Sequence, residues 1–554
     1  MEKVDRLWQD LGELVNSTVE SAVAKVSAVP GSAFVVRYIK SSYQNDPIRT
    51  LLELLLLLFA IRYFLASKYS TTKKNYVHLE DYEVDELVDD WEPEPLVSPL
   101  TDLEKRTLAN MPIIKGPNGP RVHLTSEKEV LSIPNKLDAA LLTTTIVDYS
   151  QASQELVNPN QYLNFTMTDV FGFGVRPDVR AEAVKTIHEY GVGSCGPAGF
   201  YGNQDAHVEC ESTLAKFLGT EAAILYSQGF ATPSSVIPCF FKRGDYIVAD
   251  KNVNISIQKG ILLSRANVLW YEHNDMVDLE AKVAQAIKMH RSRSLPRRII
   301  ITEGIFEYSG DSPDLAKMVE IRNKYKFRLM VDESWSFGVL GKTGRGLAEA
   351  CGVDRRDVDF TIASLANAGG SAGGFCAGWK FMVDHQQITS LAYTFSATMP
   401  PYLARNTSAI VREYLSDPAH ETLALSSLRE KVNVFVNTLE QDSEFNKYAY
   451  IVSRRESPLV VVRLHRAYLP QINKALIKVK QAKVAEEELA DIYQRIVEAT
   501  LARGVIISRQ QVLGRFEKFD IVQGLRVVVN DNLTSEEIES GAKAFASAIS
   551  EVFA

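Results

Sequence analysis

The stretch FRLMVDESWSFGVLGKTGRG, residues 327–346, gives the clearest indication of the fold class. It opens with an apolar run typical of a buried strand, which ends at Asp332, and it continues into a loop with four glycines. Comparable apolar runs lie at residues 222–227, 245–250, 297–304 and 359–364, and helical patterns occupy 277–290 and 315–325. Strands that alternate with helices predict an α/β fold with a mostly parallel sheet covered on both faces.

Segments of different character flank this core. The chain has 554 residues, so we expect several structural units. The patterns predict an N-terminal amphipathic helix region at 1–46, a transmembrane helix at 47–66, an acidic linker at 67–115, a large domain at 116–430 and a smaller C-terminal α/β domain at 431–554. Within the smaller domain, helical patterns occupy 486–503 and 535–553.

The composition argues against several classes of protein. A net charge of −8 offers no basic footprint for binding nucleic acid. The five cysteines are odd in number and show no CxxC spacing, so we expect neither a disulfide framework nor a metal site. This cysteine usage is typical of a reducing compartment and favours a cytosolic location for the main body.

The first hundred residues suggest contact with a membrane. Apolar residues at helical spacing over 4–26 predict an amphipathic helix that lies on a membrane surface or packs on a partner. Residues 47–66 are rich in leucine and, as a helix, would cover about 30 Å, which predicts a transmembrane span; a buried core helix is the alternative. Residues 78–95 carry nine carboxylates and no Lys or Arg, which predicts a solvated, extended linker that ends near WEPEPL, residues 91–96.

Two features of the main body are compatible with a ligand site and equally with a structural role. An acidic residue that leaves a parallel strand, as Asp332 does, can hold the protonated ring nitrogen of pyridoxal phosphate, and it can equally cap the next helix. The segment GVGSCGPAGFYG, residues 191–202, has five glycines, so its backbone can approach a ligand or another chain closely. No GxGxxG follows a strand and no GxxxxGK[ST] occurs, which disfavours the common nucleotide-binding folds.

Further motifs carry a resemblance to a known family. They are YGNQDAH at 201–207, LYSQGFAT at 225–232, TEGIFEYSGD at 302–311, DFTIASLANAGGSAGG at 359–374 and FSATMPP at 395–401. Together with residues 191–202 and 327–346 they resemble the α-oxoamine synthase family, from residue 162 to the C-terminus, about 70% of the chain. These are fold-type I, pyridoxal-phosphate-dependent enzymes that condense an amino acid with an acyl-CoA. The resemblance implies a large domain with a mostly parallel sheet and a smaller C-terminal α/β domain.

The same motifs depart from the family where it binds its cofactor. Asn367 stands at the position of the Schiff-base lysine, and an amide has no basic amine to attack an aldehyde. Asn254, in the further run ADKNVNIS at 249–256, stands at the position of the histidine that stacks on the ring, and Trp335 stands at another histidine position, whereas Asp332 and His207 are retained. Lys380, the next lysine along the chain, lies too far from position 367 to replace it. The resemblance therefore implies no catalytic residue on this chain and a pyridoxal phosphate bound covalently by a partner only.

Within the family, the chain looks most like the non-catalytic long-chain-base subunits. They share the segment GVGSCGPAGFYGNQD, the WEPEPL segment, an N-terminal membrane helix and Asn at the lysine position. The resemblance implies a heterodimer with a lysine-bearing catalytic subunit that condenses L-serine with palmitoyl-CoA to 3-ketosphinganine. It also implies an endoplasmic reticulum membrane location, and it suggests small activating subunits and Orm-type regulators as further partners.

The resemblance assigns the remaining candidate residues to the partner's active site. Ser396 would approach the phosphate of the partner's cofactor, and the partner's substrate cleft would be lined by Cys195, Gly196, Pro197, Phe200, Tyr201 and Gly202. We expect Cys195 to be a small packing residue, because no His or Lys lies within a few residues to activate its thiol. Two other functions stay open: a self-sufficient synthase that uses another lysine, and a membrane scaffold or regulatory subunit without a role in substrate choice.

Overall fold

The computed structural model describes residues 37, 41, 47–65, 79–92, 96–97, 99–125, 161–290, 295–416, 418–469, 479–511, 513 and 516–554. The chain divides into two units, Met1–Pro99 and Leu100–Ala554. The predicted amphipathic helix at 4–26 lies outside the described residues. The finer domain boundaries expected from the sequence stay predictions; residue 430 lies within a continuous helix, α18 (Pro418–Gln441).

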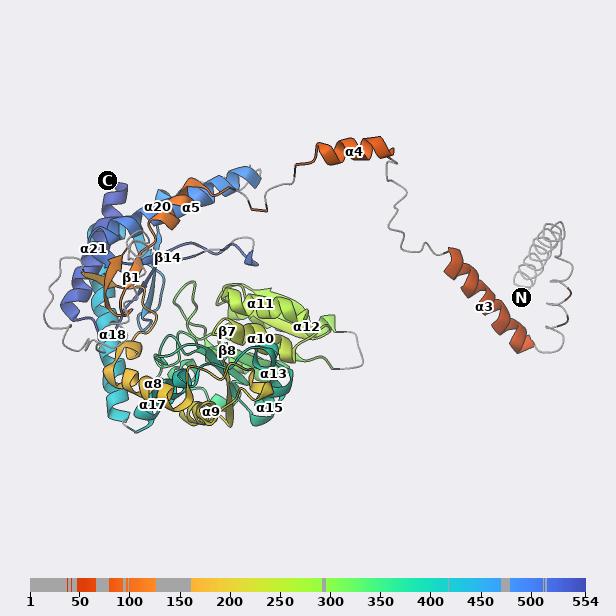
Figure 1. Cartoon of the computed structure of the whole chain (residues 1–554), viewed down its shortest axis with the longest axis horizontal. Coiled ribbons are helices and arrows are strands. Elements are labelled where there is room, and N and C mark those ends of the chain that lie inside the picture. The colour runs from red at the N-terminus through yellow and green to blue at the C-terminus, as the bar shows by residue number, and fades with distance from the viewer. Residues whose placement is uncertain are drawn as a thin grey trace, which may run out of the picture. The chain divides into compact units, whose positions relative to one another are not determined.

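Unit 1 contains helix α3 (Pro47–Leu65) (Figure 1). Its described apolar side chains are exposed, from Leu52 to Phe64. Among the described residues, however, no helix is both long and apolar enough to cross a bilayer, so the structure does not support the predicted transmembrane helix at 47–66. The physical reason is charge: Arg49, Glu53 and Arg62 interrupt the sequence, and the apolar run between Glu53 and Arg62 covers roughly 12 Å.

The acidic segment of unit 1 also differs from the expectation. It forms helix α4 (Asp81–Asp89), so the prediction of an extended chain is wrong over these residues. The Glu80 side chain accepts from the backbone of Glu83 and the Glu83 side chain accepts from the backbone of Glu80, which satisfies two otherwise unpaired N–H groups of the first turn. Acidic residues in that turn favour the helix through its dipole. No residue of α4 is buried.

The centre of unit 2 is a seven-stranded sheet with the order β4-β10-β9-β8-β7-β5-β6. Its strands are β4 (Ala222–Tyr226), β5 (Tyr246–Asp250), β6 (Asn267–Tyr271), β7 (Arg298–Glu303), β8 (Arg328–Asp332), β9 (Phe360–Ser364) and β10 (Gly374–Gly378). The neighbours from β6 to β9 are parallel, and β10 is antiparallel to both β4 and β9. The predicted mostly parallel α/β fold is confirmed.

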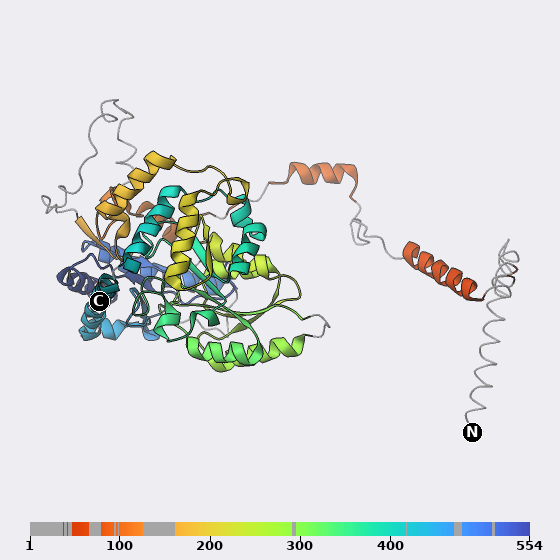
Figure 2. The ribbon, with the colours of Figure 1, turned by 90° about the horizontal axis from the view of Figure 1, so that it is seen from below.

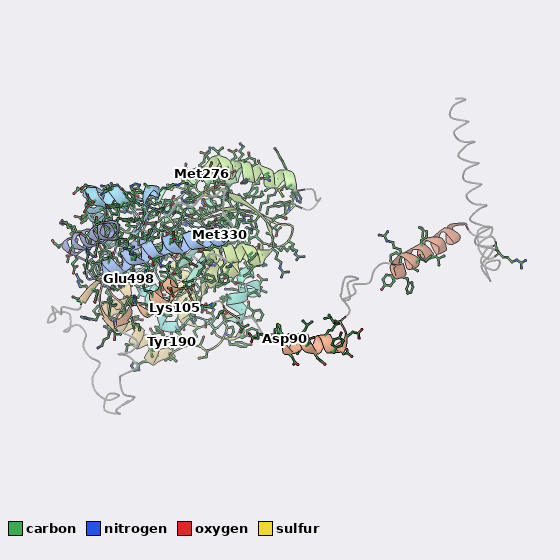
Figure 3. All side chains as sticks on the ribbon, turned by 90° about the horizontal axis from the view of Figure 1, so that it is seen from above. Asp90, Lys105, Tyr190, Met276, Met330 and Glu498 are labelled. Atoms are coloured by element: carbon green, nitrogen blue, oxygen red, sulfur yellow. The ribbon has the colours of Figure 1, made fainter. Side chains whose placement is uncertain are left out.

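Side chains of this sheet alternate between two hydrophobic cores. Ile300 on β7 packs with one core, together with α9 (Asp205–Leu218), α12 (Met276–Met289) and α13 (Leu315–Tyr325). Ile299 and Ile301 pack with the other, together with α10 (Ala231–Phe240), α11 (Ile255–Ser264) and α15 (Lys380–Thr389). The strands run between these two helix layers (Figures 1 and 2), and Met330 of β8 is fully buried (Figure 3). Burial on both faces explains why the central strands read as continuous apolar runs.

Two smaller sheets complete unit 2. One has the order β11-β12-β15-β14, with β11 (Ala449–Ile451), β12 (Leu459–Leu464), β14 (Ser508–Arg509) and β15 (Leu525–Val528). The other joins β1 (Ile113–Lys115), β2 (Arg121–Thr125) and β3 (Gln161–Asn164) to β13 (Val505–Ile506). Helices α20 (Val479–Leu501) and α21 (Ser535–Phe553) pack with these sheets and α18 packs against α21, whereas α17 (Pro401–Ser416) packs against α8 (Pro177–Tyr190) and α9. Short α5 (Asp102–Ala109) lies along α20 (Figures 1 and 3), where Arg106 Nη2 contacts Asp491 Oδ1 at 2.7 Å.

Candidate functional site

Polar side chains gather where the parallel strands end. Asp250 ends β5, Glu303 ends β7, Asp332 ends β8 and Ser364 ends β9. The carboxyl ends of parallel strands share one edge of the sheet, where α/β proteins usually hold their ligands. Asp250, Glu303 and Asp332 are all buried. We call this group, with Asn254 and Asn367, the cleft residues, after the ligand cleft that α/β proteins usually have at this edge of the sheet.

Asn254 joins two of the buried carboxyl groups. It is the N-cap of α11, where its Oδ1 accepts from the backbone N–H of Ile257 at 3.1 Å. Its own backbone N–H donates to Glu303 Oε1, and its side chain also hydrogen-bonds to Asp332. Burial raises the pKa of both carboxyl groups, and for Glu303 the neighbouring Asp332 charge raises the pKa further. Burial therefore favours the protonated form of both carboxyl groups over the form an exposed carboxyl would take.

Asn367 is engaged in a backbone hydrogen bond. It follows β9 and is buried, and its Nδ2 donates to the carbonyl oxygen of Ser334 at 2.7 Å. The Ser334 hydroxyl accepts from the backbone N–H of Ser364 at 3.0 Å, so the amide helps to tie the loop after β8 to the end of β9. Lys380, considered above as a substitute, has its Nζ paired with Asp384 on the exposed side of α15 at 2.7 Å.

Two further sequence candidates have structural contacts. Trp335 is buried, and the guanidinium of Arg526 lies 4.9 Å from the centre of its ring. His207 is buried at the start of α9, where Nδ1 accepts from the backbone N–H of Gln204 at 3.0 Å and Nε2 lies 2.7 Å from the carbonyl oxygen of Met399. A carbonyl oxygen only accepts, so His207 carries its proton on Nε2, and burial lowers its pKa.

The cleft residues do not fit a covalently bound pyridoxal phosphate. Position 367 supplies an amide whose nitrogen is already donating to Ser334. Asp332 accepts from the backbone N–H of Ser334 at 2.9 Å, and burial raises its pKa to about 6. Asn254, fixed as a helix cap, offers no aromatic ring to stack on a cofactor. These residues can order loops, and they cannot form a Schiff base.

A second set of predicted residues is held together beside this edge. Residues 194–202 lie against residues 391–399, which include α16 (Leu391–Phe395), and we call the two segments the loop surface. Thr398 Oγ1 donates to the carbonyl oxygen of Gly202 at 2.9 Å. The backbone N–H of Thr398 donates to the carbonyl oxygen of Gly196 at 3.0 Å. An isolated bridge pairs Pro197 with Ala397. Segments about 200 residues apart therefore form one connected surface.

The loop surface presents both predicted and unpredicted side chains. Tyr201 is fully exposed and Phe200 is 59% exposed, with its ring 6.4 Å from that of Phe395. Cys195 is exposed instead of packed inside, and both Cys195 and Tyr201 adopt the left-handed backbone conformation. Ser396 is exposed and lines a hollow of about 20 Å³. Sequence reasoning did not assign Leu391 and Phe395 to a surface, although Phe395 opens the FSATMPP motif; they are 62% and 68% exposed.

Sequence reasoning also missed His273, which joins the strand ends of the cleft. Its Nδ1 lies 2.9 Å from Asp250 Oδ1 and its Nε2 lies 3.0 Å from Asp311 Oδ2. Burial acts to lower the pKa of His273, but the two carboxylates outweigh it and raise the pKa to about 9. A charged imidazole thus holds β5 to the loop after β7 at neutral pH.

Comparisons with known proteins agree with this architecture. The family model for aminotransferases of class I and II matches residues 163–545. The chain is 35% identical over 540 residues to serine palmitoyltransferase 1 of Saccharomyces cerevisiae, which covers 94% of this chain and 92% of that protein. It is 36% identical over 401 residues to long chain base biosynthesis protein 1 of Arabidopsis thaliana, with coverage of 72% and 74%.

A solved structure of a serine palmitoyltransferase from Sphingomonas wittichii shares the fold. It aligns with a TM-score of 0.60 and 22% identity over 72% of this chain and 89% of that one. The resemblance drawn from the motifs is confirmed at the level of the family. The chain belongs to the aminotransferase class I and II family and is a homologue of serine palmitoyltransferase subunit 1.

Proposed function

We propose that this chain is the non-catalytic subunit of a heterodimeric serine palmitoyltransferase and that its loop surface completes the active site of a lysine-bearing partner subunit. The observation that carries the proposal is the engagement of Asn367, whose amide nitrogen donates to Ser334 at the position where the family has its lysine. An amide so placed cannot capture the cofactor aldehyde. The partner would bind the pyridoxal phosphate covalently, and this chain would bind none.

The loop surface supports the proposal of a partner. Phe200, Tyr201, Leu391 and Phe395 are each more than half exposed. Large apolar and aromatic side chains gathered on one exposed surface are typical of a protein interface. The hydrogen bonds of Thr398 hold the two backbone segments in one arrangement. The loop surface would therefore lose little conformational freedom when a partner binds. The heterodimer would thus form through a preformed surface.

The proposed reaction joins the α-carbon of L-serine to the thioester carbonyl carbon of palmitoyl-CoA. The serine carboxylate leaves as carbon dioxide, the thiol of CoA is released, and the product is 3-ketosphinganine. The cofactor on the partner supplies the electron sink for this chemistry. Ser396, exposed on the loop surface, would contact the phosphate of that cofactor, and Cys195 with Gly196, Pro197, Phe200, Tyr201 and Gly202 would line the partner's substrate cleft.

Co-purification tests the proposal most directly. The chain is expressed alone and together with a lysine-bearing relative, and condensation of L-serine with palmitoyl-CoA is assayed in both preparations. We expect activity only in the pair. Turnover by the isolated chain, or a cofactor absorbance band that borohydride reduces, would instead support a self-sufficient synthase.

A substitution in the loop surface separates the lining role from a scaffold role. Cys195→Trp places a large side chain at an exposed position, so it should leave the fold intact. If this residue lines the shared cleft, the complex should change its selectivity among amino acids and among acyl-CoA chain lengths. Unchanged selectivity in a fully assembled complex would favour a scaffold or regulatory subunit.

We also propose that the chain resides at the endoplasmic reticulum membrane with unit 2 in the cytosol. The exposed apolar side chains of α3, among them Leu56, Phe59 and Phe64, would be covered by lipid or by partners such as small activating subunits and Orm-type regulators. Protease treatment of sealed microsomes should digest unit 2 without detergent.

A further inference from the structure

A hollow of about 490 Å³ opens at the opposite edge of the large sheet from the cleft residues. Arg298, Arg328 and Phe360 are the first residues of the parallel strands β7, β8 and β9, so this is the amino edge. The volume is within the usual range for small-molecule sites. The lining also includes Arg297 and Lys326, with Phe240, Phe381 and His385. We call it the amino-edge hollow.

Three of its cations lack an acidic partner in the described part of the chain. Arg297 Nη1 donates to the carbonyl oxygen of Phe240 at 2.6 Å, which leaves its charge uncompensated. Arg298 Nε is shielded from solvent and meets no acceptor among the described residues. Lys326 is exposed and forms no ion pair there, whereas Arg328 pairs with Asp359 at 2.6 Å. Positive charges collected in a concave site attract anions.

One side of the amino-edge hollow is aromatic. The rings of Phe240 and Phe360 lie 4.8 Å apart, and the ring of His385 lies 5.1 Å from that of Phe240. Phe381, at the start of α15, is 61% exposed. Such rings can cover a flat or apolar group while the arginines hold an anionic group beside it.

We propose that the amino-edge hollow binds an organic phosphate: its phosphate group would lie against Arg297, Arg298 and Lys326 and its flat or apolar group against Phe381 and Phe240. The guanidinium fork matches phosphate oxygens and forms paired charge-assisted hydrogen bonds with them. The same chemistry is offered by a soluble nucleotide and by the headgroup of an anionic lipid. The hollow lies at the far ends of the strands from the cleft residues, so this proposal does not depend on the proposed function.

Lys326 adds a conformational argument. It caps α13 with a φ of +59°, in the left-handed region that glycine occupies most readily. A lysine at such a position bears a cost that a glycine would avoid. Strained residues of this kind persist most often at functional sites. The strained residue is thus one whose side chain lines the amino-edge hollow.

Binding to the full-length chain tests the proposal. Pyrophosphate and ADP are titrated by calorimetry, and vesicles of phosphatidylcholine with and without phosphatidic acid are sedimented with the protein. Two variants remove charge from the hollow, Arg298→Gln and Lys326→Gln. Lys216→Gln is the matched control, because Lys216 is exposed on α9 and does not line the hollow. Melting curves show whether each variant is folded.

We expect saturable binding of at least one probe and a loss of about tenfold in affinity for each hollow variant, with no change for the control. If the protein binds ADP and does not bind the vesicles, the site is assigned to a soluble phosphate. If it binds only the vesicles that contain phosphatidic acid, the site is assigned to a lipid headgroup. Phe381→Ser should weaken ADP or lipid binding and leave pyrophosphate binding unchanged. The proposal is overturned if no probe binds, or if folded Arg298→Gln and Lys326→Gln proteins bind as the control does.

Discussion

The cleft residues and the loop surface come from the same set of family motifs, and the two regions differ in what their side chains are free to do. In the cleft, Asn367 and Asn254 donate to or accept from the protein itself, and Asp332 and Glu303 are buried together. On the loop surface, Tyr201, Phe200 and Phe395 are fixed by their backbones yet have their side chains exposed. The polar side chains of the interior are thus bonded to other groups of this chain, while the side chains of the loop surface are available to contact another molecule.

Under the proposed function, this contrast explains how a subunit without a Schiff-base lysine would stay necessary to its complex. Hydrogen bonds from amides replace the contacts that a cofactor would make, so the ends of the strands stay ordered. The loop surface depends on that order only through the backbone, because its segments are joined by the contacts of Thr398, Gly196 and Gly202. Substitutions in the cleft should therefore affect stability, and substitutions in the loop surface should affect the activity of the complex.

The largest effect is expected for Gly202→Ala. A Cβ at position 202 would lie 2.0 Å from the carbonyl oxygen of Gly196 and 2.7 Å from that of Pro197, and backbone atoms cannot move aside as a flexible side chain can. The loop would have to open, and we expect near-complete loss of condensation activity in the co-purified pair. Gly193→Ala is the matched control: a Cβ at Gly193 has no atom within 4 Å, so activity should be retained. Full activity of Gly202→Ala would mean that this loop does not shape the shared site.

The next effect concerns the pH dependence of stability. The folded pKa of His273 is raised from 6.5 to about 9, so its contribution is complete below pH 6.5 and is lost as the pH rises toward 9. The shift corresponds to about 3 kcal/mol, and the unfolding midpoint in urea should fall over that interval. His273→Gln should remove this part of the pH dependence.

His188→Gln serves as the control for that measurement, since His188 is exposed on α8. Its urea midpoint should follow the pH dependence of the unchanged protein. If the His273→Gln protein shows the same decline between pH 6.5 and 9, the contacts with Asp250 and Asp311 do not stabilise the cleft. If His273→Gln also changed the pH profile of condensation by the complex over the same interval, it would contradict the expectation that substitutions in the cleft affect stability and not activity.

Much of the fold could be predicted because burial on both faces leaves a clear signal in the sequence. Strands β4, β5, β7, β8 and β9 coincide with apolar runs, and α13 and α21 end where their periodicity ends. Strand β10 was missed, because GFCAG is short and begins and ends with glycine, which is uncommon within strands. Strand β6 was also missed; it lies at the edge of the sheet, where its residues are only partly buried.

For the candidate site, the sequence offers residue assignments by resemblance, which stay predictions, and it offers no geometry. The resemblance assigns Asn367 and Asn254 to the positions of the family's lysine and histidine, but nothing in the sequence indicates that Asn367 bonds to Ser334 or that Thr398 bonds to Gly202. Those contacts join residues distant along the chain, so only the folded arrangement reveals them. The structure does not support the transmembrane prediction, which relied on leucine content although Arg49, Glu53 and Arg62 interrupt the apolar sequence.

A smaller effect is expected for Thr398→Val on the loop surface. The substitution keeps the shape and removes a hydroxyl that contacts Ser194, Gly196 and Gly202. We expect the variant to lose about 1–2 kcal/mol of stability and the pair to lose a few-fold in activity, measured by melting and by the condensation assay. Thr343→Val is a suitable comparison, because Thr343 bonds to Glu349 away from the loop surface. If both variants reduce activity equally, the effect reflects general stability and not the loop surface.

The smallest effect is expected for Asn367→Ala, and it separates the two regions most sharply. Loss of the bond to the Ser334 carbonyl should cost about 1 kcal/mol of stability, because that buried acceptor is left without its donor. Condensation by the co-purified pair should stay within about twofold of normal, since this amide takes no part in a reaction that occurs on the partner. Asn323→Ala, at an exposed position of α13, should change neither quantity. A large loss of activity in a stable, assembled Asn367→Ala complex would show that the cleft of this chain still acts on substrate or cofactor, and the division between a self-contained interior and a working surface would then be wrong.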